Sequence, residues 1–289
     1  MKAKDKLSAT EQNLLTAKKI ARLFSGIDNV VAITAGGSLS RGFSDKYSDI
    51  EMYVYYEHQM PDKKDIASIL EKLHAPLTRS KKIFWFHEAW GYHTFFKVDG
   101  VKIELGYRNT QDIERRMDFF LKSFSLPRHG IHDTPFGHYE SGVANCILES
   151  VILYKKNNWF RTIQSKLKAY PKRLKEATLE YYYRDAKVMT DVKIRQAIDR
   201  NDTLHFHACL ARVLRSLNLC IFALNEKYYP GDKWNDKYIS KFSVIPEDYI
   251  SDTENILQKG CVVLEDKKVV YRMLHKMIHE VHFLIKQQA

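Results

Sequence analysis

Thr34-Ala-Gly-Gly-Ser-Leu-Ser-Arg-Gly-Phe-Ser-Asp-Lys-Tyr-Ser-Asp-Ile-Glu-Met-Tyr-Val-Tyr-Tyr56 is the most informative stretch of this chain. It continues a short β-branched run, residues 30–34, of the kind that forms a buried strand. Residues 35–38 form a predicted turn, whose glycines let the backbone approach a ligand closely and expose its N–H groups. Residues 50–56 are predicted as a second strand. Alone, a Gly-Gly-Ser sequence indicates no more than a turn.

Two acids follow the turn at a spacing that places them together. Asp49 lies eleven residues after Ser38, and Glu51 lies two residues further on. Residues i and i+2 of a strand project to one face, so the two carboxylates stand side by side. Adjacent carboxylates repel each other unless a cation or a proton separates them, and hard oxygen ligands suit Mg²⁺. Taken alone, such a pair more often marks the exposed end of an edge strand.

A third acid, Glu104, lies in the predicted strand 101–107. The apolar residues of this strand share one face, and Glu104 is on the other. If the strand lies beside residues 50–56, Glu104 joins Asp49 and Glu51. Three such carboxylates could hold two metal ions about 3.5–4 Å apart, as phosphoryl-transfer sites do. A solvent-facing strand acid is the structural alternative for Glu104.

Together these features resemble the DNA polymerase beta-like nucleotidyltransferase superfamily. Its signature is a Gly-Ser turn, an Asp-x-Asp/Glu pair on a strand, and a third carboxylate on a later strand. The stretch from Gly37-Ser38 to Asp49-Ile50-Glu51 is most similar to the lincosamide and aminoglycoside (antibiotic) nucleotidyltransferases. The resemblance is specific over residues 30–56 and looser to Tyr107. Glu51 replaces the commoner Asp, as it does in lincosamide-type enzymes.

The resemblance implies a Mg²⁺-dependent enzyme that moves an NMP, AMP first, from ATP or another NTP to a hydroxyl of a small-molecule acceptor, with antibiotics among the candidates. Gly37 and Ser38 would hold the β and γ phosphates. Asp49 and Glu51 would bind Mg²⁺, and two ions are compatible with the three acids. Glu104 would be the general base or a ligand of the second metal. Arg41 is a further phosphate contact or, equally, a solvated loop residue.

The second half of the chain is predicted to be helical. Helices are expected over residues 111–121, 142–154, 159–170, 171–199, 204–228 and 267–286, after earlier helices over 8–24 and 63–72 and strands over 82–89 and 94–98. The predicted fold class is therefore α+β. A small mixed β-sheet nucleotidyltransferase domain with flanking helices occupies residues 1–135. An α-helical bundle domain, expected to bind the substrate, occupies residues 136–289, and a cleft between the two is expected.

Composition limits the partners. The 289 residues carry a net charge of +11, which favours an anionic partner such as a nucleotide. No apolar run reaches the roughly 18 residues of a membrane helix, and no signal core follows the basic N-terminus, so we expect no membrane partner and a cytoplasmic location. The four cysteines form no CxxC pair, which argues against zinc. A homodimer remains open.

Two other functions stay open at this stage. One is nucleotidyl transfer to RNA, which is disfavoured because no recognisable RNA-binding module is present. The other is a nucleotide-binding, toxin–antitoxin-type or catalytically silent interaction protein. In the helical half, Arg212 and Arg215 share a helix face and could contact phosphate, although a structural ion pair is the more probable role. Lys233 lies in an aromatic loop that could line the acceptor pocket or plug the core.

Overall fold

The computed structural model describes residues 7–79, 82–87, 91–123 and 140–288. The chain divides into two compact units, which are described separately. The first comprises Met1–Phe119 and Cys146–Ala169, and the second comprises Phe120–Asn145 and Tyr170–Ala289. The predicted boundary between residues 135 and 136 falls outside the described residues. In the structure, Cys146–Ala169 belong to the first unit although they follow that boundary in the sequence.

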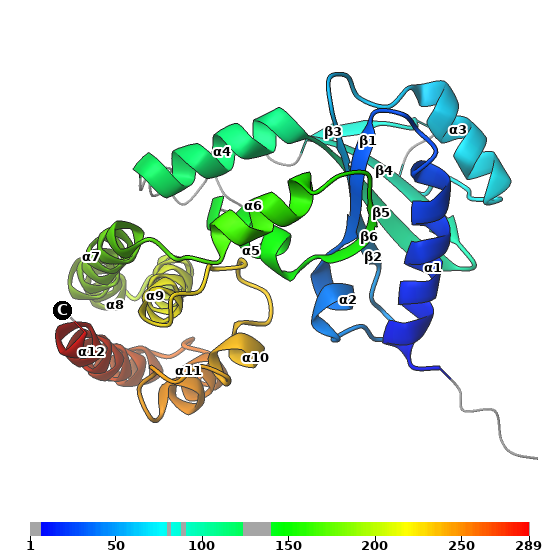
Figure 1. The fold of residues 1–289 in the computed structure, drawn as a ribbon. Helices are drawn as coiled ribbons and strands as arrows, with labels where there is room; N and C mark the ends of the chain where they lie inside the picture. The colour runs from blue at the N-terminus through cyan, green and yellow to red at the C-terminus, as the bar shows by residue number, and fades with distance from the viewer. Residues whose placement is uncertain (1–6, 80–81, 88–90, 124–139, 289) are drawn as a thin grey trace, which may run out of the picture. The chain divides into compact units, whose positions relative to one another are not determined.

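The first unit is built on a six-stranded mixed sheet (Figure 1), in the order β3-β4-β5-β2-β1-β6. Its strands are β1 (Val30–Ala35), β2 (Ile50–Tyr56), β3 (Trp85–His87), β4 (Gly91–Val98), β5 (Val101–Asn109) and β6 (Val151–Lys155). Strands β2 and β5 run parallel, and every other neighbouring pair is antiparallel. The parallel pair lies at the centre of the sheet, so its residues are covered by strands on both sides.

One face of this sheet is apolar and is covered by two helices (Figure 1), α1 (Ala9–Phe24) and α3 (Lys63–Lys72). Strand alternation places Ile50, Met52 and Val54 on this face, where they are fully buried. Helix α1 begins where the sequence predicts, because Ser8 and Glu11 form a reciprocal capping box. The expected helix at residues 63–72 is likewise present. The other face carries the acidic residues.

The predicted helix over residues 142–154 is wrong in its second half. Helix α5 (Glu140–Glu149) ends at Glu149, and residues 151–155 form β6, which pairs antiparallel with β1. Because the run is continuously apolar, its periodicity does not distinguish a helix from a strand. As a strand it pairs with the open edge of β1, which satisfies its backbone hydrogen-bonding groups. Helix α6 (Trp159–Leu167) follows β6. Helices α2 (Gly37–Arg41) and α4 (Thr110–Ser123) lie earlier in the chain.

The second unit is helical among its described residues. Its elements are α7 (Lys172–Val188), a π-helical segment (Met189–Ile194), α8 (Arg195–Asp199), α9 (Thr203–Leu224), α10 (Asn235–Ile239), α11 (Tyr249–Gln258) and α12 (Leu264–Gln287). The sequence pattern predicts one helix over 171–199, and the π-helical segment shows where it is distorted. Helices α10 and α11 were not predicted. The α+β fold class, a mixed sheet followed by helices, is confirmed.

Helix α9 is the centre of the core of the second unit. Among the described residues it is the one helix long and apolar enough to cross a membrane by length and composition. However, 67% of its most apolar window is buried inside the protein, as in the core helix of a soluble domain. Thirteen of its residues are buried against the neighbouring helices. Its apolar composition is therefore explained by packing.

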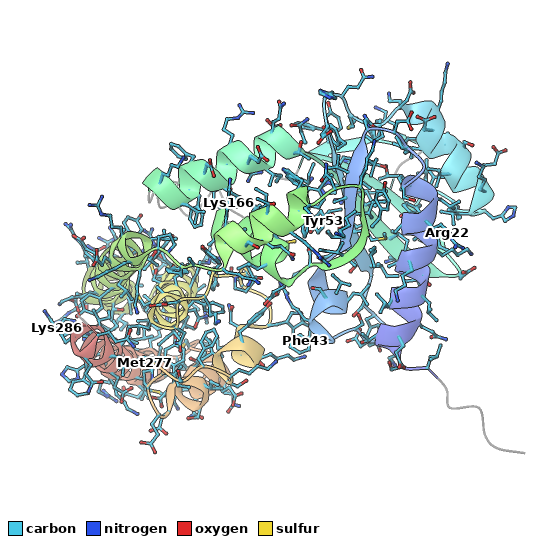
Figure 2. All side chains as sticks on the ribbon, in the orientation of Figure 1. Arg22, Phe43, Tyr53, Lys166, Met277 and Lys286 are labelled. Atoms are coloured by element: carbon cyan, nitrogen blue, oxygen red, sulfur yellow. The ribbon has the colours of Figure 1, made fainter. Side chains whose placement is uncertain are left out.

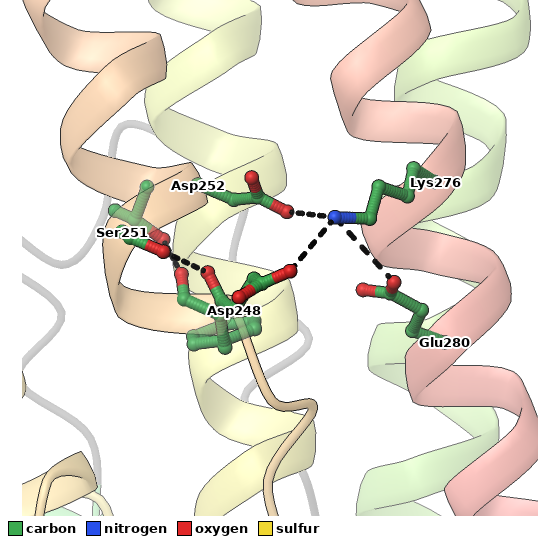
Figure 3. Close-up of polar contacts among 7 residues, drawn as sticks. Asp248, Ser251, Asp252, Lys276 and Glu280 are labelled. Atoms are coloured by element: carbon green, nitrogen blue, oxygen red, sulfur yellow. Dashed lines mark hydrogen bonds and ion pairs between the residues drawn. The ribbon is translucent and has the colours of Figure 1, made fainter.

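An ion-pair cluster joins α11 to α12 (Figure 3). The ammonium of Lys276 lies 2.9 Å from Asp252, 3.5 Å from Asp248 and 3.7 Å from Glu280. Asp252 is buried, so its charge needs a nearby cation. Lys276 supplies that charge from the facing helix, and the cluster holds the two helices together.

Candidate active site

The acids lie on the sheet face opposite to α1 and α3, here called the site face. Strand register places Glu104 of β5 directly beside Glu51 of β2, and Phe95 of β4 directly beside Glu104. Direct partners on neighbouring strands point to the same face, about 4.8 Å apart along the sheet. The sequence-based expectation that Glu104 joins Glu51 depended on this pairing. The parallel β2–β5 pair therefore brings the two glutamates together.

The Gly36-Gly37 turn lies against the Glu51 carboxylate. The Gly36 N–H donates to the Glu51 carbonyl at 2.9 Å, which continues the β1–β2 ladder into the turn. Gly37 has a φ of +59°, and a Cβ there would lie 2.5 Å from Oε2 of Glu51. Only glycine fits both the left-handed conformation and this close approach. The predicted turn over residues 35–38 passes into helix α2 at Gly37, and the predicted approach of this backbone to a ligand stays a prediction.

Asp49 precedes β2 by one residue and is exposed. It is near enough to act on Glu104 electrostatically: burial first, then Glu51 and Asp49, raise the pKa of the Glu104 carboxyl to about 7. Arg79 and Arg108 oppose this shift. Three acids thus share one electrostatic environment. A carboxyl with this pKa is poised to accept or release a proton near neutral pH.

Among the described residues, no group of three or more His, Cys, Asp or Glu side chains forms a cluster that could hold a metal ion. The three acids share a field without forming a closed ligand set. Their donor type, hard carboxylate oxygen, is the type that Mg²⁺ prefers.

A buried histidine, which the sequence analysis did not single out, lies behind Glu104. His93 of β4 faces Gly106 of β5, where a Cβ would lie 2.9 Å from the histidine Nε2. A guanidinium nitrogen of Arg108 lies 3.4 Å from His93 Nε2. Nε2 lies 3.8 Å from Oε1 of Glu104. His93 and Arg108 therefore form a polar layer beside the acids.

Arg79 is a second cation at the site that sequence reasoning missed. Its guanidinium lies 4.0 Å from the ring centre of Trp85 and 4.8 Å from that of Phe95. The N–H of the preceding residue, Thr78, donates to the Phe95 carbonyl at 2.9 Å and fixes the segment to β4. Two aromatic faces thus hold the arginine next to Glu104. Only the strand pairing could have shown this.

Ser38 and Arg41 lie in the short helix α2. The Ser38 hydroxyl is 3.4 Å from that of Ser44. Arg41 donates through Nε to Glu149 of α5 at 2.8 Å, and both side chains are mostly buried. The solvated-loop alternative for Arg41 is wrong, because the residue is held in an ion pair. Its role as a phosphate contact stays a prediction.

One end of the site face is covered by residues of the first unit. Tyr55 packs against Trp159 and Phe160 of α6, at ring-centre distances of 5.4 and 5.0 Å. Tyr53 (labelled in Figure 2) lies beside Cys146 of α5, and Cys146, burial and Glu51 raise its pKa well above the usual value. These residues close one end of the face. Glu104, with a side chain 35% exposed, lies toward the open end.

The arginines proposed in the helical half have structural partners. Arg212 donates to Asp185, and Arg215 donates through Nε to Asp232 at 2.9 Å. The more probable of the two predicted roles, an ion pair, is present at both positions. In the aromatic loop, Tyr229 is fully buried and donates to Asp232. The loop therefore plugs the core of the second unit, as the structural alternative proposed.

Comparisons with known proteins give little direct assignment. The family model described as a domain of unknown function (DUF4037) matches residues 139–235, less than half of the chain. No curated protein matches. The chain is similar over 95% of its length to a nucleotidyltransferase-like protein from Exiguobacterium sibiricum 255-15, 75% of which is covered, at 10% identity and a TM-score of 0.44. It is similar over 89% of its length to the soluble domain of CorA from Methanocaldococcus jannaschii, 96% of which is covered, at 12% identity and a TM-score of 0.18. Both TM-scores are too low to support a functional assignment.

Proposed function

We propose that this chain is a metal-dependent nucleotidyltransferase. The observation that carries the proposal is the register of β2 and β5, which pairs Glu51 with Glu104 beside the Gly36-Gly37 turn. Two neighbouring carboxylates can bind a divalent cation, and the backbone N–H groups of a glycine turn can contact phosphate oxygens. Together they suit a substrate whose phosphate charge is neutralised by that cation. The resemblance of residues 30–56 to the polymerase beta-like superfamily supports the same reading independently of the geometry.

In this proposal the residues have separate tasks. The Gly37 backbone and Ser38 contact the outer phosphates of the triphosphate, and Asp49 and Glu51 hold Mg²⁺. When bound, Mg²⁺ would neutralise charge on the triphosphate and on the departing pyrophosphate. The acceptor hydroxyl oxygen forms a bond to the α-phosphorus while the bond between that phosphorus and the bridging oxygen breaks. Glu104 accepts the hydroxyl proton, for which a pKa of about 7 is suited.

The donor nucleotide and the acceptor are the finer parts of the proposal. AMP from ATP is the first donor to test, and a small molecule with a free hydroxyl, an antibiotic included, is the acceptor class. Transfer to RNA and binding without turnover are the competing functions. The cytoplasmic location expected from the sequence fits each of these.

The first experiment is isothermal titration of the full chain with each NTP, with and without Mg²⁺. We expect one NTP to bind only with Mg²⁺, and Asp49→Ala to lose this binding. Asp65→Ala is the matched control, because Asp65 is exposed on α3 at the opposite face of the sheet. Binding that persists in Asp49→Ala would support a nucleotide-binding protein without the proposed metal site. No binding to any NTP would contradict the proposal.

A further inference from the structure

Three cations lie near Glu104 on the site face. Lys97 of β4 and Lys102 of β5 are direct register partners. They lie two residues along their strands from Phe95 and Glu104, respectively. Both therefore point to the site face, and both are exposed. Arg79 is the third cation, held over Phe95. We call these three residues the basic group.

Arg79 lies against two rings and acts electrostatically on Glu104, but the charges of the two lysines are not matched by a neighbouring acid in the described part of the chain. Among the described residues, none of the three members of the basic group forms an ion pair with an acid. Lys97 and Lys102 are like charges on directly opposed residues, an arrangement that destabilises a strand pair. Arg79 is fixed by two rings, so its charge is held in one place. An anion bound among the three would relieve this repulsion.

The position of the basic group indicates which substrate it would serve. The triphosphate of the donor is expected at the Gly-Ser turn, which adjoins β1 and Glu51. Lys97 of β4 and Arg79, which lies over Phe95 of β4, are across Glu104 from that turn, whereas Lys102 lies two residues before Glu104 on β5 itself. Glu104 is the residue proposed to take the proton of the acceptor hydroxyl. A group bound at Lys97 and Arg79 is therefore on the acceptor side.

We propose that the acceptor is a small phosphorylated molecule, whose phosphate binds Arg79, Lys97 and Lys102 while a nearby hydroxyl meets Glu104. This inference rests on the proposed function. Arginine and lysine both bind phosphate, arginine through its planar fork and lysine as a point charge. A cationic acceptor would be repelled by the same three residues. A group of only three cations fits a single phosphate and not a long polyanion.

The test is isothermal titration with a panel of sugar and polyol phosphates, each paired with its unphosphorylated parent. The protein is first saturated with Mg²⁺ and an ATP analogue whose α–β bridge is a methylene group, so that transfer cannot occur. We expect at least one phosphate to bind more tightly than its parent. Lys102→Gln should weaken this binding by roughly tenfold, as loss of one charge-assisted hydrogen bond predicts. Lys64→Gln, an exposed lysine on α3, should leave it unchanged.

The outcomes separate this inference from the proposed function. Donor binding without any preference for phosphates over their parents would overturn the inference and leave the nucleotidyltransferase proposal intact. Equal weakening in Lys102→Gln and Lys64→Gln, or tighter binding of a cationic aminoglycoside, would also overturn it. Short single-stranded RNA serves as a further probe, and affinity that rises with RNA length would overturn the small-molecule acceptor. Phosphate binding with no donor binding would refute both the acceptor role and the proposed function.

Discussion

Gly37→Ala separates the function of the Gly-Ser turn from its stability. Gly37 has a φ of +59°, and an added Cβ would lie 2.5 Å from Oε2 of Glu51 and 2.7 Å from its Cδ. The left-handed conformation costs alanine about 1–2 kcal/mol, equivalent to a Tm decrease of roughly 2–8 °C in a chain of this size. The clash adds little to this cost, because the carboxylate is the mobile end of a side chain and can rotate away. That rotation moves Glu51 out of its place beside Glu104.

The expected result is a large loss of binding with a small loss of stability. Displacing a proposed metal ligand should weaken Mg²⁺-dependent NTP binding by roughly tenfold to a hundredfold. Titration calorimetry gives the affinity and thermal unfolding gives the Tm. Gly42→Ala is the matched control, because Gly42 also has a left-handed φ, +72°, but nothing within 4 Å of an added Cβ. The two variants should lose similar stability, and only Gly37→Ala should lose affinity. Unchanged binding in Gly37→Ala, or equal loss in both, would refute this account of the turn.

Three further predictions concern the site and the helical unit. Because the pKa of Glu104 is about 7, the folded metal-free protein holds the proton of this carboxyl more tightly than the unfolded chain does. The resulting stabilisation of the folded state is full below about pH 4.5 and is lost as pH rises through 7. The Tm difference between wild type and Glu104→Gln should therefore change with pH across this window, and a constant difference would contradict the shift. Gly106→Ala places a Cβ 2.9 Å from Nε2 of the buried His93, so overpacking should lower stability by about 1–3 kcal/mol, measured by denaturant unfolding. Lys267 is fully buried and donates two 2.8 Å hydrogen bonds to the α8–α9 turn, so Lys267→Met should cost about 1–3 kcal/mol, whereas Met at the exposed Lys268 should change stability little.

The part of the site that local pattern could predict is the part that depends on strand alternation. Asp49 and Glu51 were placed on one face because residues two apart in a strand always share it. Glu104 was assigned to the same face of its own strand for the same reason. The pairing of β2 with β5 was a conditional expectation, since register is set by tertiary packing across about fifty residues of chain.

The residues that were missed depend on contacts between strands. His93 lies between the predicted strands 82–89 and 94–98 and Arg79 lies before the first of them, and nothing in the local sequence shows that they lie beside Glu104. Gly106 gives a signal that could have been used, because a glycine inside a predicted strand indicates a close approach by another group. The strand β6 was missed because a short apolar run is compatible with helix or strand until its partner is known.

The dual assignment of Glu104, as general base or as metal ligand, follows from the same geometry. Glu104 lies between Glu51, its partner on β2, and Phe95, its partner on β4, with Arg79 held over Phe95. On the Glu51 side it faces negative charge, which raises its pKa, and Arg79 opposes that shift. A cation held by Glu51 would lower the pKa of Glu104, whereas a phosphate bound to Arg79 would raise it. The proton affinity of Glu104 is thus set jointly by what binds on its two sides, so the base would be tuned only when donor and acceptor are both present.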